Sequence, residues 1–174
     1  MKIGLIDVDS HNYPNLCLMK ISAFYKANGA EVEFVKRGGI YSKVFISKVF
    51  TESREPDIQF TAEEIHRGGS GYDLKNKLPE MIEHIYPDYS LYPELTRNKA
   101  YGWLTRGCPR MNHAQSYGGF CITPDKDGCK AVKVADLEEF WNGQERIMLY
   151  DQNILACHER EDLLMQLADS KAIV

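Results

Sequence analysis

Four residues that can bind a transition metal lie close together in the second half of the chain. Cys108, Cys121 and Cys129 fall within 22 residues, and His113 lies between the first two. Thiolates and imidazoles bind zinc and iron–sulfur clusters. The cysteine count is odd and no secretory signal is present, which argues against disulfides. We predict a metal site at Cys108 and Cys121, with either Cys129 or His113 as a further ligand. The alternative is a loop with free thiols, because C-x12-C without a second pair is a weak zinc pattern.

A second polar group follows the first apolar run of the chain. The triplet Asp9-Ser10-His11 comes directly after the run KIGLIDV. Open α/β sheets bind ligands at the carboxyl ends of their strands, so a carboxylate and an imidazole are well placed there. We predict that Asp9 and His11 bind a small ligand. The alternative is a polar loop that only begins the following helix.

The segments around this triplet predict a strand–helix–strand unit. Asn15 can cap a helix that ends at Asn28-Gly29, and short apolar runs flank it on both sides. Such a unit is normally parallel. Thr61 and Glu64 have the spacing of a capping box, which favours a short helix there. The expected elements are strands at 2–8, 30–37 and 41–50, and helices at 15–29, 60–69 and 78–85.

The second half of the chain repeats the alternation of strand and helix after a segment rich in tyrosine and proline. We take 86–99 as a linker. The expected elements beyond it are strands at 100–107, 145–151 and 171–174, and helices at 134–143 and 159–170. The fold class is therefore α/β: a Rossmann-like, mostly parallel sheet with flanking helices in 1–85, followed by an incomplete βα-barrel segment in 100–174. The later strands either extend the first sheet or form a second, smaller one.

Long stretches of the sequence are similar to the N-terminal part of bacterial radical SAM proteins, in a branch from gut bacteria and phages. These stretches include MKIGLIDVDSHNYPNLCLMKISAFYKANGAEVE, RGGSGYDL, LPEMIEHIYPDYSLYPEL, AYGWLTRGCPR, FCI and VADLEEFWNGQERIMLYDQNILA. The resemblance covers nearly the whole chain. It implies a cobalamin-binding-like α/β domain followed by a radical SAM barrel. In that family a C-x-x-x-C-x-x-C loop holds a 4Fe-4S cluster, and the cluster binds S-adenosylmethionine and cleaves it to a radical.

The resemblance assigns roles to several residues of this chain. Cys108 matches the first cluster ligand, and Phe120-Cys121 match the aromatic residue near adenine and the last ligand. Asp151 and Asn153 follow a strand where the family holds the nucleoside cofactor. In the first domain, Asp9 and His11 fit part of the cobalamin signature D-x-H-x-x-G, with Pro14 in place of glycine.

Two departures from the family pattern shape the functional prediction. Twelve residues separate Cys108 from Cys121 where the family has six, and the middle cysteine is missing. Only 66 residues follow Cys108, whereas a complete barrel takes about 250 residues. We therefore expect a fragment or degenerate member of the radical SAM family that is not catalytic alone. The alternative is a non-catalytic Rossmann-like module that binds a small ligand, cobalamin or a nucleotide.

Composition limits the remaining function classes. The net charge of −4 does not indicate nucleic-acid binding, and no apolar stretch approaches the length of a membrane span. Because no signal peptide is evident, we expect a cytoplasmic protein. The open edge of an incomplete barrel favours a homo-oligomer or a partner chain that supplies the rest of the barrel.

Overall fold

The computed structural model describes all 174 residues, in two compact units. The first unit is Met1–Leu95 and the second is Thr96–Val174, so the division falls inside the segment expected to be a linker. Each unit is described by itself. None of the helices combines the length and the apolar composition that crossing a bilayer requires.

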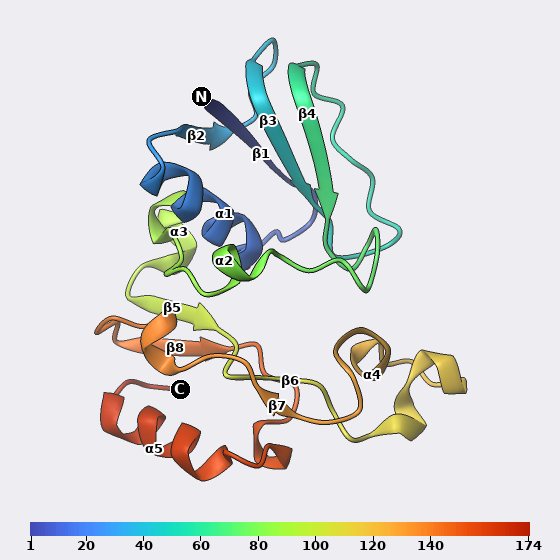
Figure 1. Cartoon of the computed structure of the whole chain (residues 1–174), viewed down its shortest axis with the longest axis vertical. Coiled ribbons are helices and arrows are strands. Elements are labelled where there is room, and N and C mark those ends of the chain that lie inside the picture. Colours follow the sequence, from blue (N-terminus) through green and yellow to red (C-terminus); the bar gives the residue numbers. More distant parts are fainter. The chain divides into compact units, whose positions relative to one another are not determined.

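The first unit is built around a four-stranded parallel sheet with the strand order β2-β1-β3-β4 (Figure 1). The mostly parallel α/β fold predicted from the sequence is confirmed. In chain order its elements are β1 (Lys2–Asp7), α1 (Leu16–Ala27), β2 (Glu31–Phe34), β3 (Ile40–Ser47), β4 (Thr61–Gly68), α2 (Glu80–Glu83) and η1 (Tyr89–Leu91). Helix α3 (Pro93–Thr96) follows at the boundary between the two units.

Alternate residues of the strands build a separate core on each face of this sheet. On one face, Ile3 and Leu5 pack against Leu18 and Ile21 of α1 and against Ile82 of α2. The other face has no helix of its own. Its core consists of Ile6, Val35, Tyr41, Val44 and Ile46, and half-buried residues of the connecting segments, including Ile58, Phe60 and Tyr72, pack against it. Burial on both faces explains why β1 is a nearly continuous apolar run.

The prediction of a helix at 60–69 is wrong, because this segment forms strand β4. It pairs in parallel with β3 over its whole length, from Ile40 opposite Thr61 to Ser47 opposite Gly68. Side chains reinforce the pairing: Lys43 forms an ion pair with Glu64 at 2.8 Å, and the His66 ring stacks on Phe45 with centroids 4.9 Å apart. Pairing along an entire strand outweighs a local capping-box pattern.

The second unit has two small sheets instead of one large one. Strands β5 (Lys99–Gly102) and β8 (Arg146–Leu149) pair in parallel, and β6 (Thr105–Arg106) and β7 (Val132–Lys133) pair antiparallel. The strands of the second half thus form sheets of their own. The other elements are η2 (Met111–His113), η3 (Gln115–Tyr117), α4 (Thr123–Asp127), η4 (Leu137–Glu139), η5 (Ile154–Ala156) and α5 (Arg160–Ser170).

The helix expected at 134–143 is also wrong, since only the single turn η4 forms there. A capping box between Asp136 and Glu139 begins the turn. Phe140 then leaves helical geometry, with φ at −139°, and its buried ring lies flat on Gly102. A side chain at position 102 would approach that ring to 2.3 Å. Burying Phe140 against the strand ends the helix.

Candidate functional site

Asp9 ties together the segments that follow β1 and β3. Its carboxylate oxygens accept hydrogen bonds from the backbone amides of Val49, at 2.9 Å, and Phe50, at 2.8 Å. The side chain is almost fully buried, and the two amides are 40 and 41 residues away in sequence. One carboxylate therefore fixes the loop after β3 at the carboxyl edge of the sheet.

The protein environment favours the ionised form of Asp9. Burial by itself would raise the pKa of this carboxyl. The hydrogen bonds from Phe50 and Val49, a further one from Ser53 and the nearby His11 outweigh burial and lower the pKa below its usual value. Asp9 is thus held as an anion by the loop that it positions.

A second polar contact joins the same strand ends. Asn15 caps α1 by accepting from the Leu18 amide at 3.2 Å, and its amide nitrogen donates to Ser47 at 2.8 Å and to Ser10 at 3.1 Å. Asn15 and Ser47 are both buried. The helix start predicted at Asn15 is confirmed, and the same residue links the end of β3 to the loop after β1.

The loop after β4 joins this edge through glycines. The Gly71 amide donates to the carbonyl of Lys48 at 3.0 Å. Gly69 has φ at +98°, and a Cβ atom there would lie 2.3 Å from the same carbonyl, so only glycine allows this approach. The Lys48 ammonium lies over the Tyr72 ring, 4.4 Å from its centroid. Three successive loops are therefore fixed side by side.

Aromatic and apolar side chains remain exposed on these fixed loops. Phe50 is 62% exposed, Tyr13 is 58% exposed and Val49 is 40% exposed. His11 is also exposed and has a left-handed backbone with φ at +43°. Such a conformation is uncommon outside glycine, and it often marks functional sites. The structure thus presents exposed aromatic and apolar side chains on loops that are joined to one another by hydrogen bonds.

The structure brings Asp9 and His11 to the edge of the sheet, as the sequence suggests, but it uses them differently. Asp9 is engaged with backbone amides, and no hydrogen bond joins it to the His11 ring. The cobalamin signature needs a carboxylate that orients the histidine, so this arrangement does not fit that role. Sequence reasoning missed Ser47 and Phe50 because both lie in the run YSKVFISKVF, which reads only as a strand.

The cysteine loop of the second unit is closed by its own backbone. The Cys121 amide donates to the His113 carbonyl at 2.8 Å, and the Gln115 amide donates to the Cys121 carbonyl at 3.1 Å. The backbone amide and the hydroxyl of Ser116 both donate to the Asp125 carboxylate. Phe120, which the resemblance places near adenine, is 82% exposed.

The four residues of the predicted metal site are in different environments. Cys108 is buried, Cys121 is half-buried and Cys129 is exposed. The His113 ring lies against Phe120, with centroids 5.9 Å apart. No group of three or more His, Cys, Asp or Glu side chains is placed to hold a metal ion. As arranged here, the residues do not fit a 4Fe-4S cluster, which needs its thiolates together.

Asp151 and Asn153 also contact the protein itself. Asp151 accepts from the amides of Leu104, at 2.9 Å, and Thr105, at 2.5 Å, and from the Thr105 hydroxyl at 2.6 Å. The side-chain amide of Asn153 lies 3.9 Å from the Cys108 sulfur. Asp151 therefore holds the chain after β5 to the chain after β8, just as Asp9 does in the first unit.

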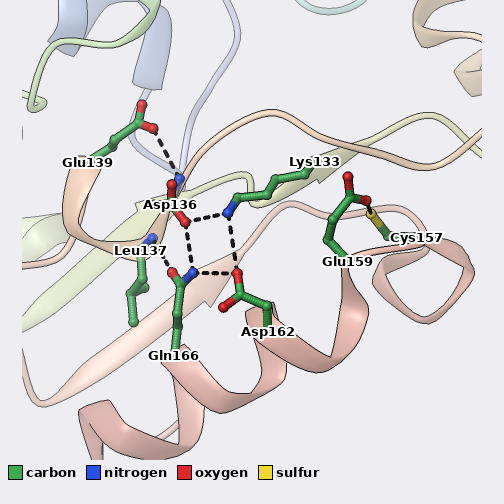
Figure 2. A network of polar contacts seen from close by, with 8 residues as sticks. All are labelled: Lys133, Asp136, Leu137, Glu139, Cys157, Glu159, Asp162 and Gln166. Carbon is green, nitrogen blue, oxygen red and sulfur yellow. Dashed lines mark hydrogen bonds and ion pairs between the residues drawn. The ribbon is translucent and has the colours of Figure 1, made fainter.

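A polar network outside all predicted sites connects η4 to α5 (Figure 2). Lys133 forms ion pairs with Asp136 at 2.6 Å and Asp162 at 3.3 Å. Gln166 donates to the same two carboxylates, at 2.7 and 3.0 Å, and accepts from the Leu137 amide at 2.9 Å. The bond from Lys133, followed by that from Gln166, lowers the pKa of Asp136. The network fixes one face of α5 against η4.

Comparison with known proteins gives no match to a family model, to a curated protein or to a solved structure.

Proposed function

We propose that the first unit binds a small planar ligand of the nucleotide type at the carboxyl edge of its parallel sheet. The observation that carries the proposal is the strand order β2-β1-β3-β4, with β1 and β3 adjacent and their following loops tied together by Asp9. In open parallel sheets of this order, the crevice outside the carboxyl ends of these two strands is where ligands bind.

The surface at this edge supports a planar ligand. Phe50 and Tyr13 present exposed rings on loops that hydrogen bonds hold in place. Heterocyclic bases stack on such rings, and each stacked base contributes about 1–3 kcal/mol. Because the loops are already ordered, little conformational entropy is lost when a ligand binds.

The test is calorimetric titration of the full chain with AMP. We expect Phe50→Ala to weaken binding roughly 5- to 150-fold, which is the loss of one stacked base. Ile40→Ala is the matched control, since Ile40 is 74% exposed at the opposite end of β3. Binding that is absent, or that Phe50→Ala and Ile40→Ala weaken equally, would refute the proposal. Tight binding of hydroxocobalamin that His11→Ala abolishes would support the cobalamin alternative instead.

A further inference from the structure

A surface pocket in the second unit lies between η4 and the end of α5. Its volume is about 450 Å³, and it is lined by Asp136, Leu137, Glu138, Trp141, Gln166, Asp169 and Ser170. Ligand pockets typically fall between about 300 and 1,000 Å³. The pocket belongs to none of the sites predicted from the sequence, but two of its lining residues, Asp136 and Gln166, also belong to the polar network drawn in Figure 2.

The charged residues that line this pocket are all acidic. Asp136, Glu138 and Asp169 contribute carboxylates, and no lysine or arginine lines the pocket. Asp136 is neutralised by Lys133, but Glu138 and Asp169 have no partner within the protein. A positively charged ligand would balance these two carboxylates.

The end of helix α5 adds to the negative potential. The last turn of a helix carries partial negative charge on its free carbonyl groups, and a carboxylate there is unfavourable. Asp169 lies in that turn, which contains no basic residue, and Lys171 caps the helix without lining the pocket. The sequence therefore places a carboxylate where the helix alone disfavours it, beside an open pocket.

Trp141 gives the pocket an aromatic wall. Its indole N–H donates to the Gln144 carbonyl at 2.9 Å, which fixes the ring in one orientation. The face of a tryptophan ring attracts ammonium groups more strongly than any other side-chain ring, and it also packs against alkyl chains. A wall of this kind favours an organic cation over a hydrated inorganic one.

We propose that this pocket binds an organic cation with one or more ammonium groups on an apolar chain, as in an alkyl polyamine. A metal ion fits less well, because no three carboxylate, thiolate or imidazole groups come together to coordinate one. The ammonium groups meet Glu138, Asp169 and the carbonyl end of α5, and the chain packs on Trp141. Gln166 is hydrogen-bonded to Asp136 and Leu137, so these three lining residues are held together by contacts within the protein.

Titration calorimetry of the full chain with spermidine tests this proposal. Each of Glu138→Gln and Asp169→Asn should weaken binding roughly 2- to 5-fold, as for an exposed ion pair. Trp141→Leu should weaken it roughly 2- to 30-fold through the lost cation–π contact. Glu161→Gln is the matched control, because Glu161 lies in the first turn of α5, outside the pocket. Circular dichroism checks that each variant remains folded.

Two outcomes would overturn the proposal. If Glu161→Gln weakens spermidine binding as much as Glu138→Gln, then only the net charge of the protein attracts the ligand. If Mg²⁺ displaces spermidine at equal concentration, the site has no preference for an organic cation. Retained binding in Glu161→Gln together with loss in Trp141→Leu would support the pocket. All of these substitutions lie in the second unit and leave the sheet of the first unit unchanged. The titration with spermidine therefore tests the pocket separately from the titration with AMP.

Discussion

Asp9 in the first unit and Asp151 in the second unit perform the same structural task with different results. Each follows a strand and accepts hydrogen bonds from two consecutive amides that lie just beyond a neighbouring parallel strand. Asp151 holds Leu104 and Thr105, which are both fully buried. Asp9 holds Val49 and Phe50, whose side chains are 40% and 62% exposed.

The difference indicates that the same carboxylate–amide contact can either stabilise buried residues or support a loop with exposed side chains. In the second unit Asp151 accepts hydrogen bonds from two buried residues, so its removal should lower the free energy of unfolding. In the first unit the carboxylate supports a loop that presents side chains to solvent, so its loss should affect both stability and the surface. Both residues were predicted to bind a cofactor, and in both the oxygens are engaged with the backbone.

The largest expected effect is that of Asp151→Ala. This change leaves two buried amides and a buried hydroxyl without an acceptor, which we expect to cost about 3–5 kcal/mol of unfolding free energy. Both tryptophans, Trp103 and Trp141, lie in the second unit, so denaturation followed by tryptophan fluorescence reports on that unit. Asp169→Ala is the control, since its carboxylate has no partner. A loss below about 1 kcal/mol, the value of a single neutral hydrogen bond, would contradict the role of Asp151.

Asp9→Ala should destabilise the first unit by a smaller amount, about 2–4 kcal/mol, because water can reach part of the released loop. Hydrogen exchange measured by mass spectrometry should show faster exchange at residues 48–53 and little change in the second unit. Asp57→Ala, which removes an exposed carboxylate from the same unit, should leave exchange unchanged. If both variants behave alike, Asp9 does not hold the loop, and the comparison with Asp151 fails.

The lowered pKa of Asp9 predicts a smaller, pH-dependent effect. Because the pKa is lower in the folded state than the roughly 3.9 of an unfolded aspartate, ionised Asp9 stabilises the fold above that value. The contribution is lost as pH falls through the folded pKa. The difference in unfolding free energy between the wild type and Asp9→Asn should therefore be constant near neutral pH and shrink below about pH 4. A difference that does not change across the acid range would disprove the linkage.

The sequence predicts the first unit better than the second for a physical reason. Strand β1 and helix α1 each bury an apolar face of their own, and Asn15 caps the helix locally, so their patterns are visible in short windows. Strand β4 is an edge strand with mostly exposed side chains, so its pattern has no apolar face to distinguish strand from helix. Only its pairing with β3 decides the outcome.

The position of the candidate site in the fold could be predicted, but its contacts could not. Asp9 and His11 follow the first strand, so they lie at the carboxyl edge of the sheet, where open parallel sheets generally bind ligands. Which atoms Asp9 contacts depends on a loop 40 residues further along the chain. In the second unit, Asp151 and the η4 turn are likewise fixed by distant partners, Thr105 and Gly102. No local pattern records such contacts.

The smallest expected effect concerns the cysteine loop, where we predict no change. Anaerobic iron–sulfur reconstitution should give the wild type no more cluster absorbance and bound iron than the double variant Cys108→Ala, Cys121→Ala. The reason is geometric: Cys108 is buried, Cys129 is exposed, and the loop between Cys108 and Cys121 is closed by its own hydrogen bonds. Gathering three thiolates would break those bonds, and the binding free energy of the cluster would have to offset that loss. Absorbance in the wild type that the double variant lacks would refute this prediction. It would then show that the loop rearranges around iron, as the resemblance to radical SAM proteins implies, and that the second unit rather than the sheet edge of the first carries the chemistry.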